Sequence, residues 1–469
     1  MINRRNFLIQ LATVSGGVVF GFNGFLRRAL ALEADATLAS MQAYGFGELL
    51  PAVTKNTGEV YLALPKGFEY KLLSKAGKIM SDGNKTPALP DGMACFKVGE
   101  EFRLIRNHEI YNDEVPQPKS AIGLNPYDET TAGGTTTLVI NPKTLEVVKD
   151  FVSLSGTLIN CAGGKTPWGS WVSCEETTLG QTERTNKKGK KIGTYPKPHG
   201  YCFEIMASAN APVQPIPLKA MGRFRHEAIA VDEHTGNIYL TEDTKTAGFY
   251  RFIPKHKQHL VEGGALQMLK IKGKEDFDLR KGLKTGQSFK TTWVTIDDPD
   301  PVTADLDESA VYKQGLAKGG ATFTRLEGAY ADKQGHIYFV STNGGEVEGG
   351  QVWRYEHKGK KSGVLTLIFE SPSRIVLDMP DNICLKPNSE LLFLCEDSDY
   401  KGAGGTPENY MRILAPNGKI ADFAKNITSG FEESEFSGST FSEDGKILFV
   451  NLQAVGATFA VWGDWDSFR

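Results

Sequence analysis

Three common catalytic signatures are missing from this sequence of 469 residues. It has no G-x-S-x-G turn that would present a serine nucleophile, and no G-x-x-x-x-G-K-[ST] loop that would hold nucleotide phosphates. Its eight histidines include no H-E-x-x-H pair. These absences argue against a serine-hydrolase elbow, a P-loop and a zincin-type site, so any chemistry must depend on another grouping of side chains.

The sequence also lacks sustained helical periodicity. Between its strand-like runs no segment keeps an apolar period of 3.6 residues, which disfavours a TIM barrel. With 40% hydrophobic residues and 51 glycines, the chain nevertheless has ample material for a core. We therefore expect one large all-β domain.

What the sequence does contain is a repeated strand pattern. Six apolar runs of strand length each end in a polar, mostly acidic cluster, at 103–109, 170–176, 238–243, 337–343, 391–397 and 447–453. In four of these units another polar residue precedes the cluster by fifteen positions, as Asp381 precedes Glu396. Fifteen residues make one β-hairpin, so both polar groups lie at the same end of it.

Six such hairpins around one axis predict a six-bladed β-propeller over residues 45–469. Loop insertions are expected at 111–135, 180–198 and 254–322, and the last is too rich in chain breakers for regular blade strands. Polar hairpin ends would then meet at one mouth. Those expected to converge there are Asn107, Glu175, Glu242, Asn343, Glu396 and Asn451.

The N-terminal segment is of a different kind. Arg4 and Arg5 precede an apolar stretch at 9–26 and the small-residue motif A-L-A at 29–31, which predicts a removed twin-arginine export signal over residues 1–31. The alternative is a membrane anchor, because the apolar length is close to the ~20 residues that span a bilayer.

Removal of this segment leaves an acidic chain. It takes away four of the 53 basic residues and none of the 56 acidic ones. An acidic surface repels phosphate backbones, so nucleic-acid binding is disfavoured. We expect a monomer that is periplasmic or secreted and that meets the twin-arginine export machinery.

The six cysteines have different surroundings. Cys95, Cys384 and Cys395 lie within apolar strand runs, where buried free thiols are expected. Cys174 instead precedes two carboxylates at a hairpin end. A thiol there would have a raised pKa and be inert unless a cation bound the thiolate. The alternative for Cys174 is a packed thiol at a strand end.

Acidic side chains are expected to crowd around the axis. They are Glu109, Glu175, Glu227, Glu242, Asp243, Glu327, Asp381, Glu396 and Asp397. Like charges within ~4–6 Å oppose one another's ionisation, so such a ring needs bound cations. Carboxylates and amides suit Ca²⁺, whereas a thiolate selects a transition metal. The sequence therefore predicts mixed ions, with some of the acids pointing outward as solvated strand ends.

Several longer stretches form specific sequence motifs. The most specific is the block N-C-A-G-G-K-T-P-W-G-S-W at 160–171, followed by S-C-E-E at 173–176. Shorter motifs agree with it: M-G-R-F-R-H-E at 221–227, T-R-L-E at 324–327, M-P-D-N at 379–382, G-S-T-F-S at 438–442 and F-V-N-L-Q at 449–453. Together these stretches are similar to the motifs of PhoX-type alkaline phosphatases, and the resemblance spans about residues 50–465.

This resemblance implies a propeller that binds iron and calcium at its mouth and hydrolyses small phosphate monoesters. Matched position by position, Cys174 would be the iron thiolate, Glu227 and Glu327 further metal ligands, and Arg325 the residue that holds the phosphate. The remaining acids are calcium candidates: Glu109, Glu175, Glu242, Asp381 and Glu396. The chain departs from the family pattern at Leu326, where a proline is expected.

Two other classes fit the same pattern. One is a calcium-dependent propeller that hydrolyses lactones or other esters, which needs a divalent ion on the axis but no thiolate. The other is a non-catalytic binding propeller whose acids hold structural calcium. Visible colour distinguishes them from an iron enzyme, because iron bound by a thiolate absorbs visible light and calcium does not.

Overall fold

The computed structural model describes most of the chain after the N-terminal segment. The described residues are 41, 44–111, 125–185, 189, 191–192, 194–401, 405 and 408–468. The export signal predicted for residues 1–31 lies outside them. Within the described ranges, no helix has both the length and the apolar character needed to cross a membrane.

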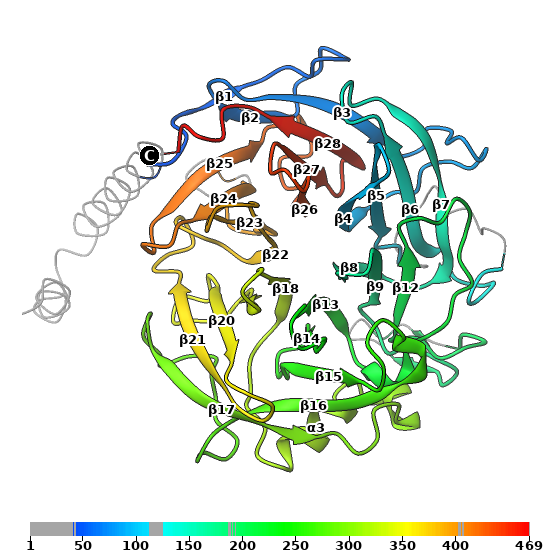
Figure 1. Cartoon of the computed structure of the whole chain (residues 1–469), viewed down its shortest axis with the longest axis vertical. Helices are drawn as coiled ribbons and strands as arrows, with labels where there is room; N and C mark the ends of the chain where they lie inside the picture. Colours follow the sequence, from blue (N-terminus) through cyan, green and yellow to red (C-terminus); the bar gives the residue numbers. More distant parts are fainter. Residues whose placement is uncertain are drawn as a thin grey trace, which may run out of the picture.

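Six inner strands stand around a central axis, each the first strand of a blade (Figure 1). They are β4 (Pro90–Val98), β8 (Asn160–Lys165), β13 (His226–Val231), β18 (Leu326–Ala331), β22 (Pro380–Leu385) and β26 (Phe436–Phe441). Each contacts the next in this order, and β26 contacts β4. The ring is therefore closed, and the predicted six-bladed β-propeller is confirmed for the described part of the chain.

The second strand of each blade carries one of the six apolar runs found in the sequence. These strands are β5 (Glu101–His108), β9 (Ser170–Glu175), β14 (Ile238–Glu242), β19 (His336–Ser341), β23 (Leu392–Glu396) and β27 (Ile447–Leu452). Nearly all of their residues are buried, because blades pack on both faces of each sheet.

The outer strands complete the blades. The third strands are β6 (Gly133–Ile140), β12 (Cys202–Met206), β15 (Tyr250–Pro254), β20 (Gln351–His357), β24 (Tyr410–Leu414) and β28 (Ala457–Trp462). The fourth strands are β7 (Val147–Thr157), β16 (Gly264–Ile271), β21 (Gly363–Glu370), β25 (Ile420–Asn426) and β3 (Glu69–Lys75). We number the blades 1 to 6 in the order of their inner strands from β4 to β26.

The remaining elements extend or connect the blades. Strand β17 (Ser288–Thr295) joins blades 3 and 4 by pairing with both β16 and β21. Strands β1 (Leu49–Pro51) and β2 (Leu62–Pro65) continue blade 5 beyond β25. The short elements are β10 (Arg184–Thr185), β11 (Lys191–Ile192), η1 (Lys219–Met221), η2 (Leu260–Glu262), η3 (Val302–Asp305) and α3 (Ala310–Leu316).

The segment 254–322 differs from the expectation that it contains no blade strands. It holds β16, the outermost strand of blade 3, and β17. In β17 exposed and buried residues alternate at the start of the strand, so Ser288 and Lys290 face outward while Phe289 and Thr291 are buried. A polar composition at the rim of the ring is therefore compatible with strands.

Hydrophobic clusters fill the spaces between blades. One cluster joins blades 2 and 3 through Val172 and Ile229, and another joins blades 3 and 4 through Tyr239 and Trp353. The last and first blades share a cluster that contains Phe449 and Met93. The core is thus distributed around the ring rather than concentrated at its centre, and the axis stays available to polar groups.

The ring closes by combining strands from the two ends of the chain. Blade 6 takes β26, β27 and β28 from the C-terminal region, and β3 pairs with β28 at the outer edge. The buried ring of Phe459 in β28 lies 5.2 Å from the Tyr61 ring and 5.6 Å from the Tyr70 ring.

We expect Phe459→Ala to weaken this closure strongly. Removal of a fully buried aromatic ring typically costs ~3–5 kcal/mol. Chemical denaturation followed by tryptophan fluorescence should show a clear fall in the unfolding midpoint. Val148→Ala in β7 is the control, because Val148 is 57% exposed and its truncation should change stability by no more than ~0.5 kcal/mol. Equal midpoints for the two variants would contradict this account of closure.

Candidate metal centre at the mouth of the ring

Each inner strand carries the same β-bulge near its first residue. In every blade, two residues of the inner strand stand opposite one residue of the second strand. The shifts lie between Pro90 and Met93, Asn160 and Gly163, His226 and Ile229, Leu326 and Ala329, Pro380 and Ile383, and Ser437 and Thr440. The first of the two bulged residues is Asp91, Cys161, Glu227, Glu327, Asp381 or Gly438.

Small residues follow these positions and let the inner strands approach closely. A Cβ atom added to Gly92 would lie 2.5 Å from Cα of Ala162. One added to Gly328 would lie 2.5 Å from the backbone oxygen of Asp381. Such separations are far below van der Waals contact, so side chains at these positions would force the blades apart.

The bulge residues gather into groups with metal-binding geometry. The ligand atoms of Cys161, Glu176 and Glu227 all lie within 4.8 Å of one another. Those of Glu227, Glu327 and Asp381 form a second such group, which shares Glu227 with the first. Blades 2, 3, 4 and 5 therefore contribute to one continuous cluster.

Two further groups complete the circle. Asp91, Glu109 and Glu435 have ligand atoms within 4.8 Å of one another, and so do Asp381, Asp397 and Glu435. Glu435 directly precedes β26 and provides the acid in blade 6, where the bulge itself carries Gly438. Every blade thus supplies at least one donor to the mouth.

Burial and like charge together oppose ionisation in this cluster. Desolvation, followed by the neighbouring Glu327 and Asp381, raises the pKa of Glu227 well above its ordinary value. Burial and the charge of Glu109 do the same to Asp91. The pKa of Asp381 rises to about 7, first through burial and then through Asp397. The group as a whole is short of positive charge.

Two arginines offset part of this deficit. Arg325 donates from Nε and Nη2 to the carboxylate of Asp243, at 3.0 and 3.3 Å, and from Nη2 to Glu327 at 2.9 Å. Arg225 donates to Glu176 and lies 3.8 Å from Asp243. Burial acts against ionisation of Asp243, but the guanidinium groups of Arg325 and Arg225 lower its pKa. Both arginines remain partly exposed at the mouth.

The donor set fits bound cations. Carboxylate oxygens at this density are the ligands of hard cations such as Ca²⁺. A single thiol, Cys161, lies among them and would bind a softer transition metal. Burial and the charges of Glu227 and Glu176 raise the pKa of the Cys161 thiol, so a cation is what would make it a thiolate.

The structure brings together five of the residues singled out in the sequence. Glu109, Glu227, Glu327 and Asp381 belong to the groups at the mouth, and Arg325 contacts Glu327. Asp243 and Asp397, which were expected around the axis, also lie there.

Glu175, Glu242 and Glu396 are not at the mouth, contrary to expectation. Each accepts hydrogen bonds at the start of the third strand of its own blade, from the N–H groups of Gly200, Gly248 and Tyr410 respectively, at 2.8, 2.8 and 3.2 Å. The fifteen-residue count does not include the bulge, and a shift of one residue moves a side chain to the other face. The mouth acids are instead the next residues along: Glu176, Asp243 and Asp397.

Cys174 is also elsewhere. It pairs with Cys202 across β9 and β12, and its sulfur lies 3.6 Å from that of Cys202. It packs in the buried cluster between blades 2 and 3, behind the mouth. The thiol at the mouth is Cys161, which belongs to the N-C-A-G-G-K-T-P-W-G-S-W block at 160–171.

Two of the amide side chains expected at the mouth, Asn107 and Asn451, join neighbouring blades instead. Asn107 donates from Nδ2 to the backbone oxygens of Cys161 and Ala162, at 3.1 and 2.6 Å. Asn451 donates to the backbone oxygen of Asp91 at 2.8 Å. Both bonds hold a bulge of the neighbouring blade in place. Asn343 accepts a hydrogen bond from Thr324 at 2.9 Å.

Sequence reasoning missed Asp91, Cys161, Glu176, Arg225 and Glu435 as residues of the mouth. Two of them carry a signal that internal comparison could have found. Pro-Asp at 90–91 repeats at 380–381, and Arg-x-Glu at 225–227 repeats at 325–327, each at the same place in its blade. Glu435 has no counterpart of this kind in the sequence.

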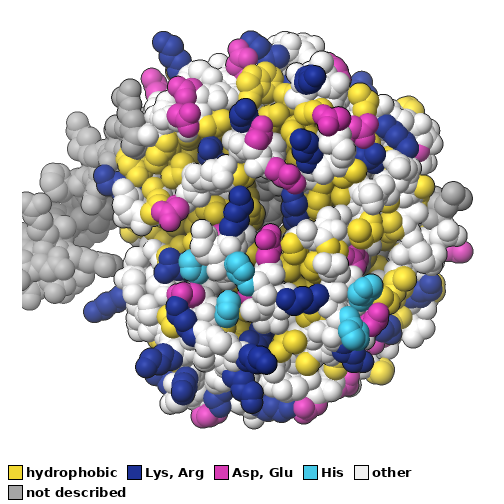
Figure 2. All heavy atoms as spheres, in the orientation of Figure 1, with side chains coloured by type: hydrophobic (Ala, Val, Ile, Leu, Met, Phe, Trp, Pro, Cys, Tyr) yellow, Lys and Arg dark blue, Asp and Glu magenta, His cyan; other side chains and the backbone are white. Residues whose placement is uncertain are grey.

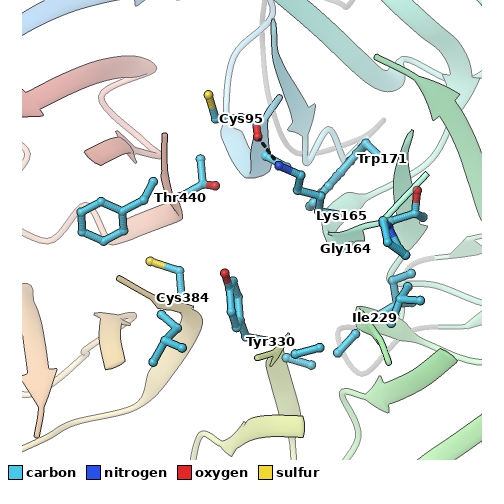
Figure 3. Close-up of a pocket in the computed structure, with 18 of the residues that line it drawn as sticks. Cys95, Gly164, Lys165, Trp171, Ile229, Tyr330, Cys384 and Thr440 are labelled. Carbon is cyan, nitrogen blue, oxygen red and sulfur yellow. Dashed lines mark hydrogen bonds between the residues drawn. The ribbon is translucent and has the colours of Figure 1, made fainter. Parts of the chain in front are cut away.

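A cavity of about 1110 Å³ lies along the axis on the other side of the bulges. Figure 2 shows one face of the ring, hollowed at its centre, with charged side chains around the hollow. In blades 1 to 5 the lining begins one residue beyond the mouth residue of the bulge, at Gly92, Ala162, Ala228, Gly328 and Asn382, and in blade 6 it begins at Gly438 itself. In Figure 3, Lys165 donates to the backbone oxygen of Cys95 at the cavity wall, at 2.9 Å. The layer of bulges therefore separates the acidic mouth from a wider cavity.

Comparison with known proteins gives consistent matches. The family model of the alkaline phosphatase PhoX matches residues 45–150 and 142–456. No curated protein sequence matches the chain. The structure of Pseudomonas fluorescens PhoX in complex with vanadate, a transition state analogue, superposes with a TM-score of 0.66 at 18% identity, covering 90% of this chain and 98% of that chain. A gluconolactonase from Xanthomonas campestris matches at a TM-score of 0.41 and 11% identity, covering 89% and 99%.

The buried His199 provides a test of how the blades beside the mouth are held. Its Nδ1 lies 2.6 Å from Glu175, and its Nε2 lies 3.6 Å from Asp128. Burial alone would lower the pKa of His199, but Glu175 and Asp128 outweigh it and raise the pKa to about 9. Because the folded protein holds this proton more tightly than the unfolded chain, the stabilisation is complete below about pH 6.5 and is lost as pH rises through about 9.

We therefore expect unfolding stability to fall by on the order of 3 kcal/mol from this group between pH 6.5 and 9. Denaturant midpoints measured across this range should show the decline. In His199→Gln, which cannot titrate, this part of the pH dependence should disappear. His256→Gln is the control, because His256 is an exposed histidine that should leave the profile unchanged. Identical profiles for wild type and His199→Gln would contradict the assignment.

Proposed function

Because this chain belongs to the PhoX family of alkaline phosphatases and is thus a phosphatase, we propose that phosphate monoesters are hydrolysed at the mouth of its ring. One observation carries the proposal. Two guanidinium groups lie beside a ring of buried carboxylates and one thiol, so the same opening can hold cations and an oxyanion.

The metal ligands follow from the four groups at the mouth. We assign iron to the group that contains Cys161, with Glu176 and Glu227, because a thiolate selects a transition metal. Calcium would be held by the all-oxygen groups around Asp381 and Glu435. When bound, such cations neutralise the charge that develops on phosphoryl oxygens and lower the pKa of water. This assignment replaces Cys174 by Cys161 as the proposed thiolate.

Arg325 is proposed to bind the phosphoryl group. Two of its nitrogens are held by Asp243 and Glu327, which fixes the direction of the guanidinium. A planar guanidinium held in this way can direct its remaining N–H groups to an oxyanion with little further loss of side-chain freedom. The backbone of Arg325 is left-handed, with φ of 40°, a strained conformation that places the side chain immediately before the bulge.

Arg225 is proposed to act with Arg325. It precedes Glu227 as Arg325 precedes Glu327, and the two arginines lie on either side of Asp243. The carboxylate of Asp243 therefore positions both guanidinium groups. The vanadate bound in Pseudomonas fluorescens PhoX supports an oxyanion site in this kind of ring, since vanadate mimics a phosphoryl group in its transition state.

The proposed substrate is a small phosphorylated molecule, taken from outside the cytoplasm by a monomeric enzyme. The twin-arginine pattern at residues 1–31 supports export, and a mouth that needs several ions favours assembly before transport.

We expect Arg325→Ala to lower turnover on an aryl phosphate by roughly 10²–10³, the effect of losing one charge-assisted contact in the transition state. Release of the phenol product gives the rate, and metal analysis checks that the ions remain. Arg280→Ala is the matched control, because Arg280 pairs only with the nearby Asp278 on the surface and should keep wild-type turnover. Unchanged turnover in Arg325→Ala would refute its role, and a native enzyme that cleaves lactones but no phosphate ester would refute the proposed function.

Export is tested separately. Replacement of both Arg4 and Arg5 by Lys should leave the precursor in the cytoplasm, because the paired arginines are the recognised feature of the signal. Fractionation followed by immunoblotting measures this, with Arg27→Lys and Arg28→Lys as the control pair. Mature protein in the periplasm of a strain without the twin-arginine machinery would contradict the prediction.

A further inference from the structure

A second set of metal-binding side chains lies behind the mouth, between blades 2 and 3. It consists of Cys174 in β9, Cys202 in β12 and His226 in β13. Their ligand atoms lie within 4.8 Å of one another, and none of the three side chains has exposed surface. None belongs to the ligand groups assigned to the mouth.

The strand register places the two thiols face to face. Cys174 and Cys202 are direct partners on adjacent antiparallel strands. The next pair along is hydrogen-bonded, since Glu175 N–H donates to the Tyr201 oxygen at 3.0 Å. Cys174 and Cys202 therefore occupy a non-hydrogen-bonded pair, in which side chains approach most closely. Their sulfurs are 3.6 Å apart, well beyond the ~2.05 Å of a disulfide.

The distances match the edges of a zinc tetrahedron. With Zn–S bonds of about 2.3 Å and Zn–N bonds of about 2.05 Å, tetrahedral angles separate two sulfurs by about 3.8 Å and a sulfur from a nitrogen by about 3.6 Å. The observed separations are 3.6 Å between the sulfurs and 3.5 Å between Cys202 Sγ and His226 Nδ1. Two edges of the ligand triangle thus already have the length that one small cation would require, and the third, between Cys174 and His226, is within 4.8 Å.

The imidazole of His226 is oriented for this role. Its Nε2 lies 2.9 Å from the backbone oxygen of Gly222, which can only accept a hydrogen bond. Nε2 therefore carries the proton, and the lone pair of Nδ1 points to the thiols. Metal-binding histidines characteristically donate their second N–H to such an acceptor. The Phe224 ring, centred 3.8 Å from the imidazole, holds its plane.

We propose that Cys174, Cys202 and His226 form a structural site for Zn²⁺ or a cation of the same borderline-soft class. Two thiolates would neutralise the ion inside the protein, and the imidazole would be the third ligand. Because the site has no exposed surface, the ion would enter as β9 and β12 pair during folding. Cys174 lies two residues before Glu176, and His226 directly precedes Glu227, so the site would position two ligands of the mouth.

Metal analysis of the purified full-length protein tests this. Wild type should hold one equivalent of zinc per chain, and Cys202→Ser should lose it. Two thiol variants are matched controls: Cys161→Ser removes the thiol of the mouth, and Cys384→Ser removes a buried thiol of β22. Both should retain the zinc. After growth with Co²⁺, thiolate-to-metal absorption should likewise persist in Cys161→Ser and be absent from Cys202→Ser.

Wild type alone also decides the question if Cys202→Ser does not fold. Unfolding with a chelating dye and a thiol reagent should release one zinc ion and expose all six thiols. Six thiols without released zinc would overturn the proposal, and so would four thiols, which would indicate a disulfide. Neither readout requires phosphatase activity, so a failure of the proposed function leaves this test intact.

Discussion

The arrangement of the mouth depends on one backbone irregularity that all six inner strands share. Side chains alternate along a strand, so an inserted residue reverses the face on which the residues before it lie. In this ring the insertion brings Asp91, Cys161, Glu227, Glu327 and Asp381 together while the rest of each strand stays in the core. The small residues that follow allow backbones of neighbouring blades to touch. Geometry and chemistry of the mouth thus have a single structural origin.

This geometry has an electrostatic cost. Two unit charges about 4 Å apart repel by on the order of 4 kcal/mol at an effective dielectric constant of 20. Each mouth carboxylate has several such neighbours, while among the residues that the structure describes only Arg225 and Arg325 provide positive charge in direct contact. Part of the folding energy is therefore spent to keep like charges together. That imbalance is what gives the mouth an affinity for cations, and the arginines at its rim give it an affinity for an oxyanion.

The fold could be predicted because the second strand of each blade is uniformly apolar and ends in a recognisable cluster. The site could be predicted only in part. A bulge leaves no mark in composition, so the first acid of each doublet, Glu175-Glu176, Glu242-Asp243 and Glu396-Asp397, was wrongly predicted to face the axis. Asp243 and Asp397 were correctly expected there, and Glu176 was not. In each doublet the first acid accepts a hydrogen bond from the backbone at the start of the following strand, and the second acid lies at the mouth. Alignment of the six units against one another, rather than hairpin length, was the available signal, as the repeated Pro-Asp and Arg-x-Glu pairs show.

The sixth blade combines strands from distant parts of the sequence, and this affects how the protein folds during synthesis. Its outer strand, Glu69–Lys75, is the first of its four strands to be synthesised. It can pair in this blade only after Ala457–Trp462 has been made, far along the sequence. Contacts so distant in sequence form slowly, and an open ring exposes unpaired strand edges that can capture other chains. In a partly synthesised chain, therefore, no ligand residue of the mouth would have its final position, including those already synthesised. The ability of the mouth to bind ions is in this sense a property of the fully synthesised chain.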